Sequence, residues 1–312
     1  MRRSLNVVCD RGTWDFVMEG YFIREVLLSG LERPVRVFPL EQDQGLPVQS
    51  NLLIVSLHNA MEPFITRVIQ AGAKNVGVFH MGDERFALDR SFYTGVDYVV
   101  RNYFHPSALA IPESSRCQGV LWVPNGYRHG IGARSPQTLT PFTDRYHVMF
   151  FSGQANAGLE GQRDRARMVD VVQRNQLPAA MMVTDRFGGG LGPATYSAYM
   201  ENSRFALAPR GHAEETIRLF DAMELGAIPI SLRHDFLLDP RAMGGAPVVI
   251  LDNWEQLPQW LAQAVMQPGA EEVWEARQKQ LIDWWSSFKI KLRSKVTELI
   301  ERSFARYPTQ SD

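Results

Sequence analysis

The sequence predicts an α/β protein of two domains, each built on a parallel β-sheet that is covered by helices. Three observations support this class. The chain has 312 residues, enough for two domains of about 150 residues each. Short runs rich in β-branched and aromatic residues alternate with amphipathic helical segments along both halves of the chain. A polar segment rich in Gly, Pro, Ser and Thr, residues 130–146, separates the two series.

The first half alternates expected strands with expected helices. The strands are Leu5–Cys9, Val35–Phe38, Leu52–Leu57, Val76–His80, Tyr98–Arg101 and Gly119–Val123. Helices are predicted at Phe16–Leu28 and Met61–Ala71. Pro63 falls in the first turn of the second helix, where a missing backbone N–H is tolerated.

The second half repeats the pattern and ends in a longer helix. Its expected strands are His147–Ser152, Ala179–Thr184, Phe205–Ala208, Ile228–Leu232 and Pro247–Leu251. Its expected helices are Gln162–Gln176, Tyr196–Asn202, Glu214–Gly226, Trp254–Met266 and a long one from Glu271 to about Ala305. We therefore predict domains at 1–135 and 147–270, followed by a C-terminal helical segment at 271–312.

Composition and net charge indicate which partners and which location to expect. The chain is 45% apolar and 21% charged with a net charge of −1, so no electrostatic case exists for nucleic acid or an anionic membrane as the main partner. Cys9 and Cys117 are far apart in the sequence and are expected to be reduced and buried. The N-terminal apolar stretch is too short for a signal peptide. We expect a cytoplasmic protein, with peripheral attachment to a membrane as an open alternative.

Residues 203–232 predict an anion-binding unit of strand, loop, helix and strand. Arg210 and Gly211 follow the apolar run Phe205–Ala208, and Thr216 lies near the start of the next helix. The first turn of a helix carries unpaired N–H groups and a partial positive charge. Glycine lets a ligand approach the backbone, and arginine adds a forked cation. This pattern predicts a site for a phosphate or diphosphate. An ordinary β-α-β unit whose helix stops at Gly226 has the same outline.

The same string resembles the C-terminal signature of exostosin-like (GT47-type) glycosyltransferases. The matching residues are Ala208, Pro209, Arg210, Gly211, Thr216, Arg218, Leu219, Asp221, Ala222, Gly226, Ile228, Pro229 and Ile230. Asp221 departs from the family, which usually has Glu there. Phe151 and Gly153, with Arg163 ten residues on, resemble the element that opens the donor half of these enzymes.

This resemblance implies the GT-B fold, two Rossmann-like domains facing across a cleft, with the long C-terminal helix crossing back to brace the N-terminal domain. It implies a hexosyl- or pentosyltransferase that moves a sugar with inversion from a nucleotide-diphosphate donor, a UDP-sugar, to an acceptor hydroxyl. The implied donor-binding residues are Gly153, Arg163, Arg210, Gly211, Thr216, Arg218 and Asp221, the last on the ribose hydroxyls. The sequence has no Asp-x-Asp motif, so we expect metal-independent transfer without a cofactor.

Two other functions stay open at this point. One is a retaining GT-B transferase that uses another nucleotide sugar. The other is a non-catalytic module that binds nucleotide sugars. The sequence leaves the acceptor open among glycans, lipid-linked sugars, proteins and modified nucleic acid, the last of which the neutral net charge disfavours.

The candidate catalytic base lies in the first half. A buried strand delivers His80, Asp83 and Glu84 onto a glycine-containing turn, where doubly wound sheets place reactive groups. A carboxylate or histidine can take the proton of an attacking hydroxyl, but these carboxylates could instead cap a turn.

Two further residues, Asp10 and His58, follow other strands and are candidate acceptor-side residues. The G-D-E turn at 82–84 and the P-x-G-Y element at 124–127 loosely resemble the ribitol-xylosyltransferase branch of the exostosin-like group.

Overall fold

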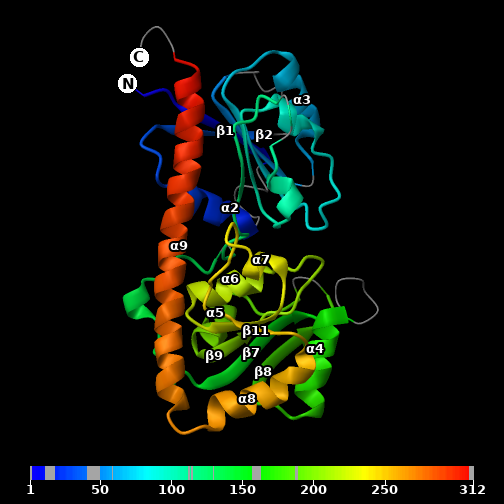
Figure 1. Ribbon diagram of the computed structural model, residues 1–312, viewed down its shortest axis with the longest axis vertical. Coiled ribbons are helices and arrows are strands. Elements are labelled where there is room, and N and C mark those ends of the chain that lie inside the picture. The colour runs from blue at the N-terminus through cyan, green and yellow to red at the C-terminus, as the bar shows by residue number, and fades with distance from the viewer. Residues whose placement is uncertain are drawn as a thin grey trace. The chain divides into compact units, whose positions relative to one another are not determined.

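The protein consists of two compact α/β units. The computed structural model describes residues 2–10, 18–40, 50–57, 59–111, 113, 115–128, 130–156, 163–186 and 189–308. Unit 1 comprises the residues up to Asn125 together with those from Lys289 on, and unit 2 comprises Gly126–Phe288 (Figure 1). All strand pairings within the described residues are parallel, which confirms the predicted α/β class.

Unit 1 is built on a six-stranded sheet in the order β2-β1-β3-β4-β5-β6. The strands are β1 (Leu5–Asp10), β2 (Val35–Leu40), β3 (Leu52–Leu57), β4 (Val76–Met81), β5 (Tyr98–Arg101) and β6 (Val120–Trp122). Its helices are α2 (Met18–Phe22), the π-helix η1 (Ile23–Leu27), α3 (Glu62–Gln70) and the short 3₁₀ helices η2 (Ser91–Gly95) and η3 (Pro106–Leu109).

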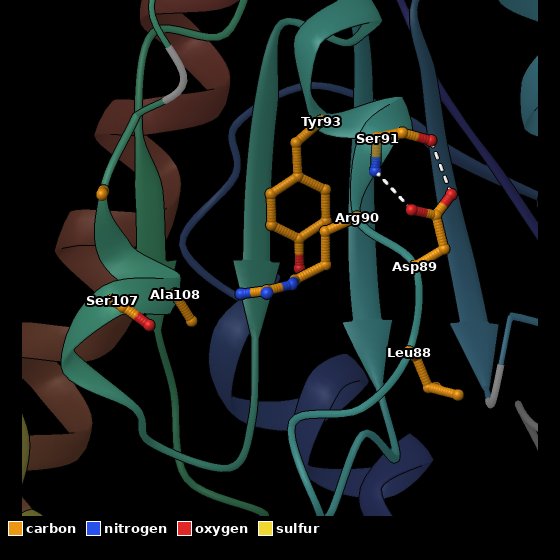
Figure 2. A pocket seen from close by; sticks show the side chains of 8 residues that line it. Leu88, Asp89, Arg90, Ser91, Tyr93, Ser107 and Ala108 are labelled. Atoms are coloured by element: carbon orange, nitrogen blue, oxygen red, sulfur yellow. Dashed lines mark hydrogen bonds between the residues drawn. The ribbon is translucent and has the colours of Figure 1, made fainter.

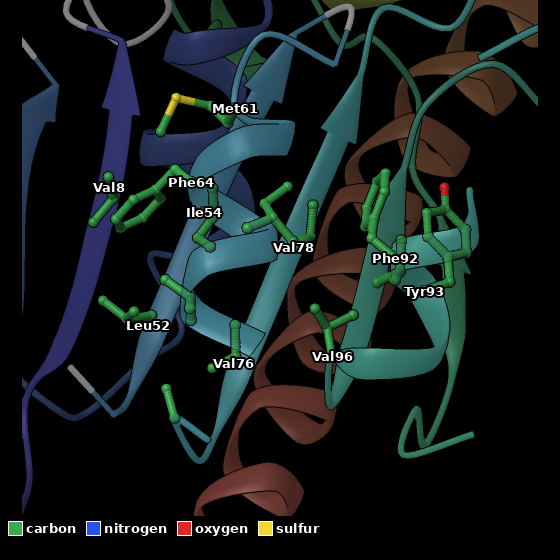
Figure 3. Packing of buried hydrophobic residues seen from close by; sticks show 14 of the residues in the cluster. Val8, Leu52, Ile54, Met61, Phe64, Val76, Val78, Phe92, Tyr93 and Val96 are labelled. Atoms are coloured by element: carbon green, nitrogen blue, oxygen red, sulfur yellow. The ribbon is translucent and has the colours of Figure 1, made fainter. Parts of the chain in front are cut away.

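The core of unit 1 forms where α3 packs on this sheet. Figure 3 shows Phe64 of α3 directed at Val8 and Ile54 of the strands, and all three belong to one buried apolar cluster. Every residue of β4 is buried, as expected for a central parallel strand that is covered on both faces. Cys9 and Cys117 are buried free thiols, as predicted.

Unit 2 is built on a five-stranded sheet in the order β11-β10-β9-β7-β8. The strands are β7 (His147–Gln154), β8 (Ala179–Thr184), β9 (Ser203–Leu207), β10 (Ile228–Leu232) and β11 (Val249–Leu251). Its helices are α4 (Arg163–Arg174), α5 (Pro193–Glu201), α6 (Ile217–Glu224), α7 (Asp235–Leu238) and α8 (Leu257–Met266), with short 3₁₀ helices η4 (Pro136–Thr138), η5 (Phe142–Asp144) and η6 (Trp254–Gln256).

The boundary between the units lies at Asn125 and Gly126, not in the polar segment 130–146 that we predicted as the connection. That segment is anchored in unit 2. The Arg145 guanidinium donates hydrogen bonds to the carbonyl oxygens of Ser203 (2.9 Å) and Leu225 (3.0 Å). Arg145 is buried, and this burial lowers the pKa of its guanidinium to about 10. The polar composition of the segment does not predict such a buried side chain.

The long helix α9 (Ala270–Arg306) contributes to both units, because the division between them falls at Phe288 and Lys289. Within unit 2, buried Trp285 donates its indole N–H to Glu224 at 2.7 Å. Within unit 1, the hydroxyl of Ser303, which has no exposed surface, donates to the Asn75 side-chain oxygen at 2.6 Å. The helix predicted from Glu271 on thus contributes to unit 2 with its first part and to unit 1 with its last part.

Candidate functional site

The candidate site of unit 2 lies at the carboxyl edge of its sheet, where β7, β9 and β10 are neighbours. The chain places β8 on one side of β7, and β9 and β10 on the other. The loops after β7 and β9 therefore diverge, and such a switch point is where open α/β sheets bind ligands. Gly153 lies near the end of β7, and Arg210 follows β9.

Arg218 of α6 is the central cation of this edge. Its side chain is buried, and its Nε and Nη2 atoms donate to the Ser152 carbonyl oxygen at 3.1 and 2.7 Å. Its guanidinium carbon lies 4.7 Å from the centre of the Phe151 ring. The third nitrogen, Nη1, is buried and has no hydrogen-bond partner among the described residues. A buried cation with an unused donor is costly, and an anionic ligand would satisfy it.

Gly153 makes room for that guanidinium. Its φ of +153° is one that side chains rarely adopt, and a Cβ at this position would overlap Nη2 of Arg218. The Phe-x-Gly element and the Arg-Leu element, which the sequence presents as separate motifs, thus form one structural unit.

The arginine that α4 brings to this edge is Arg165, not the predicted Arg163. Arg165 Nε donates to the Arg210 carbonyl oxygen at 3.2 Å, and a Cβ on Gly211 would lie 2.5 Å from Arg165 Nη2. Arg163 is exposed at the first position of the helix. The helical periodicity of the sequence could have indicated Arg165 rather than Arg163, because Arg165 precedes buried Met168 by one turn and shares its face.

Two backbone N–H groups of the loop after β9 already have acceptors within the protein. The Arg210 N–H donates to the Asp164 carboxylate at 2.9 Å, and the Gly211 N–H donates to the Ala213 carbonyl at 2.9 Å. A diphosphate could reach the Gly211 N–H only if that second bond opened. The Arg210 side chain itself is 42% exposed, with Nη1 3.8 Å from Glu214 Oε1.

Helix α6 begins at Ile217, so the predicted start near Glu214 is wrong. The Gly211–Ala213 hydrogen bond belongs to a turn, and residues 211–214 bend rather than coil. Thr216 is the N-cap residue, and its side chain makes no capping hydrogen bond. Its hydroxyl therefore does not cap the helix, as expected of a hydroxyl that binds a ligand.

Asp221 is buried, and protein groups already occupy its carboxylate. Its carboxylate accepts hydrogen bonds from the Arg128 backbone N–H (2.9 Å), the Arg128 Nε (2.7 Å) and the Tyr196 hydroxyl (3.1 Å). The side chain has no exposed surface, and this burial raises the pKa of the Asp221 carboxyl in spite of the neighbouring Arg128. Contact with ribose hydroxyls stays a prediction, and it requires Arg128 to release this carboxylate.

In unit 1, the three candidate bases lie in the last part of β4 and in the acidic turn after it, and they differ in burial. His80 has no exposed surface, and its Nδ1 lies 2.8 Å from the Tyr93 hydroxyl. Asp83 is 3% exposed, and its carboxylate accepts the backbone N–H groups of the turn that follows, at Ala87 (2.9 Å) and Leu88 (3.2 Å).

The second Asp83 oxygen lies 3.3 Å from Arg101 Nη2, so the whole carboxylate is engaged in holding the turn. Glu84 is half-buried and accepts one bond, from the Tyr103 hydroxyl at 3.3 Å. The structure thus places only Glu84, of the three, where its carboxylate can meet a ligand.

The two acceptor-side candidates are Asp10, which ends β1, and His58; β1 and β3 are adjacent strands at the switch point of the first sheet. His58 lies outside the described residues, and of Asp10 only the backbone, as the last residue of β1, is described. Their predicted role stays a prediction.

A cavity of about 450 Å³ lies beside the acidic turn of unit 1. Leu88, Arg90, Ser91, Tyr93 and Ser107 contribute to its lining, and Figure 2 shows the Arg90 side chain extending toward the hydroxyl end of Tyr93. The sequence carries no signal for this cavity, because η2 and η3, which carry Tyr93 and Ser107, are too short to leave a periodic pattern.

Within the described part of the chain, no group of three or more His, Cys, Asp and Glu side chains could hold a metal ion. No helix among the described residues is long and apolar enough to cross a membrane.

Comparison with protein families matches the second half of the chain. Residues 158–305 match the family described as the RXYLT1 C-terminal domain. Ribitol-5-phosphate xylosyltransferase 1 of Homo sapiens is 29% identical over 125 residues, which make up 35% of this chain and 27% of that protein. The chain thus matches about a quarter of the length of this curated relative.

Comparison with solved structures covers nearly the whole chain. Sucrose-phosphate synthase from Thermosynechococcus elongatus superposes with a TM-score of 0.57 at 10% identity, covering 98% of this chain and all (100%) of that one. The fold is GT-B. The DNA-modifying β-glucosyltransferase, another GT-B protein, has a TM-score of 0.53 at 10% identity and covers 96% of this chain and 100% of its own. At these identities the likeness to solved structures concerns the fold alone, and the family match concerns residues 158–305.

Proposed function

We propose that the protein is a glycosyltransferase that takes a sugar from a nucleotide-diphosphate donor, a UDP-sugar, and transfers it to an acceptor hydroxyl with inversion. The observation that carries this proposal is Arg218, a buried cation with an unused donor at the switch point of unit 2. The family match at residues 158–305 includes this region. The similarity to ribitol-5-phosphate xylosyltransferase 1 favours a pentose on the donor.

Charge is the main contribution that this site makes to the proposed reaction. As the bond between sugar and diphosphate breaks, negative charge grows on the leaving group. Arg218 and Arg165 are already in place at the sheet edge, so their charges stabilise the leaving group without reorganisation. Arg210, half-exposed on the neighbouring loop, adds a third cation, and the Thr216 hydroxyl adds an uncharged donor. This arrangement takes the place that a metal ion would otherwise fill.

Glu84 is the proposed base. It accepts the proton of the attacking hydroxyl, while Asp83 holds the shape of the turn through the backbone N–H groups of Ala87 and Leu88. The cavity beside this turn is the proposed position of acceptor contacts, with Arg90 and the Ser107 hydroxyl among its polar groups.

A panel of nucleotides and nucleotide sugars tests the donor. A ligand present at a hundred times its dissociation constant stabilises the folded state by about 2.7 kcal/mol, which a thermal-shift measurement detects. We expect stabilisation by UDP and UDP-sugars, UDP-xylose included, and only about 0.4 kcal/mol for Arg218→Met at the same concentrations, if its affinity is a hundredfold lower. Stabilisation by GDP or ADP alone, or an equal response of the variant, would contradict the proposal.

Two assays separate the alternatives to inverting transfer. Slow release of free sugar from the donor without acceptor identifies an active enzyme, whereas a binding module leaves the donor intact. The anomeric configuration of the transferred sugar, measured by NMR, distinguishes inversion from retention.

A further inference from the structure

Arg128 is a further arginine that the structure holds beside Arg218. It directly follows the P-x-G-Y element, and the Asp221 carboxylate of α6 accepts both its backbone N–H (2.9 Å) and its Nε (2.7 Å). Asp221 comes three residues after Arg218, so the two side chains share one face of α6. Burial lowers the pKa of the Arg218 guanidinium, and the charges of Arg165 and Arg128 lower it further. Arg128 is therefore a close electrostatic neighbour of Arg218.

The guanidinium of Arg128 is fixed on two sides. Its Nε is held by Asp221, which has no exposed surface, and its guanidinium carbon lies 4.2 Å from the centre of the Tyr196 ring. The Tyr196 hydroxyl in turn donates to the same carboxylate at 3.1 Å. A side chain that is already fixed loses little conformational entropy when it binds a ligand.

The forked end of this guanidinium is not used by the ion pair. Within the described part of the chain, neither Nη1 nor Nη2 of Arg128 has a hydrogen-bond partner, and the side chain is 24% exposed. Arg116 and Asp97 form a pair of similar burial, with Arg116 23% exposed and Asp97 fully buried. There, Nε and Nη2 both donate to the carboxylate, as is common where arginine serves a carboxylate. Arg128 instead keeps its fork for another acceptor.

We propose that Arg128 is an anion-binding residue of the diphosphate site, and that Asp221 is the positioning residue that holds it there. This inference rests on the proposed function of that site. A fixed guanidinium presents its donors to the leaving diphosphate without reorganisation as negative charge grows on it. Glu215, a buried carboxylate in the loop before α6, interacts with other groups of the protein, and the carboxylate that contacts Arg128 is that of Asp221.

The test is calorimetric titration of inorganic diphosphate and of UDP into the unchanged protein and into Arg128→Gln. The amide nitrogen of glutamine is as many bonds from Cα as the Nε of arginine, so it can still donate to Asp221 while the fork is absent. We expect this variant to fold and to bind both ligands about ten- to a hundredfold more weakly, through the loss of charged hydrogen bonds. Equal affinities of the variant and the unchanged protein for both ligands overturn the inference.

Arg134→Gln is the matched control. Arg134 is 30% exposed, its backbone N–H donates to Glu224 at 2.7 Å, and its Nε donates to Glu201 at 2.5 Å. These glutamates are the last residues of α6 and α5, whereas the anion site lies at the start of α6. We therefore expect unchanged affinity for both ligands. A loss as large as that of Arg128→Gln would mean that both variants act through the fold, and would overturn the inference.

Asp221→Asn separates positioning from contact with ribose. Inorganic diphosphate has no ribose, so a contact of Asp221 with ribose hydroxyls would lower the affinity for UDP alone. If Asp221 holds Arg128, both affinities fall by the same factor, about three- to tenfold, because a neutral amide holds the guanidinium less firmly. In the Arg128→Gln background the same substitution should then have little further effect. A fall for UDP alone, no fall for either ligand, or an equal fall in that background overturns the positioning role.

The outcomes separate this inference from the proposed function. If diphosphate binding depends on Arg128 but no nucleotide sugar is consumed, the inference stands and the transferase proposal fails. If Arg128→Gln consumes a nucleotide sugar at the unchanged rate and binds UDP with unchanged affinity, the transferase stands and the inference fails. If neither ligand binds the unchanged protein, both fail.

Discussion

Replacing Arg218 by Met tests whether this residue serves a ligand or the fold. Burial lowers the pKa of the Arg218 guanidinium from its ordinary value to about 10. At about 1.4 kcal/mol for each pKa unit, the protein makes the charged form roughly 3 kcal/mol less favourable than it is in water. Methionine removes this penalty and keeps most of the apolar stem that lies against Phe151.

The variant also loses the two hydrogen bonds to the Ser152 carbonyl oxygen. Bonds from a charged donor contribute about 1.5–3 kcal/mol each, so the loss of two of them matches or exceeds the roughly 3 kcal/mol that methionine relieves. We expect the free energy of unfolding of Arg218→Met, measured by urea denaturation, to equal that of the unchanged protein or to fall below it by up to about 3 kcal/mol. Its affinity for UDP, measured by calorimetry, should fall by about 3 kcal/mol, roughly a hundredfold.

The pH dependence has a definite sign. Because the folded-state pKa of Arg218 is depressed, the charged group weakens the fold at neutral pH, and this cost disappears as the pH rises through about 10. The stability of Arg218→Met relative to the unchanged protein should therefore fall further above about pH 9. A variant that unfolds readily at pH 7 yet binds UDP normally when folded would refute the reasoning, since the residue would then act only in the structure.

Three further predictions concern single residues. Gly153→Ala should lose about 1–3 kcal/mol of stability, measured in urea, because its new Cβ overlaps the buried guanidinium and its backbone disfavours a side chain; unchanged stability would show that this edge can relax. Glu84→Gln should abolish transfer with UDP affinity intact, whereas Asp83→Asn should chiefly reduce stability, because its carboxylate holds backbone N–H groups; full turnover of Glu84→Gln would assign the base elsewhere. Arg165→Met should weaken UDP binding about tenfold in calorimetry, and Arg163→Met, its matched control at an exposed position, should not; the reverse order would restore the sequence-based assignment.

The arrangement of strands was predictable because parallel β-α-β units leave strong local signals. β3, β8 and β10 have the predicted bounds, and α9 starts within one residue of the predicted start. Glycine and proline mark the ends of these elements, and burial on both faces makes the strands continuously apolar. The same local signals brought Gly153, Arg210 and Arg218 to one edge of one sheet.

Contacts between distant residues were not predictable from these signals. The Asp221 carboxylate accepts from Arg128, 93 residues away in the sequence, and no periodicity links the two. A bend at residues 211–214 stands where we expected the first turn of a helix, because the Ala213 carbonyl, which would accept from the Ile217 N–H in that turn, accepts from the Gly211 N–H instead. Which of two arginines on α4 faces the sheet depends on the rotation of that helix, and a motif match cannot resolve a difference of two positions.

The division of α9 between the units has a consequence for how the chain folds during synthesis. Unit 2 is one continuous stretch, Gly126–Phe288, whereas unit 1 needs the residues from Lys289 on. Asn75 and Arg33 must wait for Ser303 and Glu301 of α9, which bond to them in the folded protein. On the ribosome the second unit can therefore finish before the first, in reverse of the usual order. Until then, Asn75 and Arg33 lack these partners.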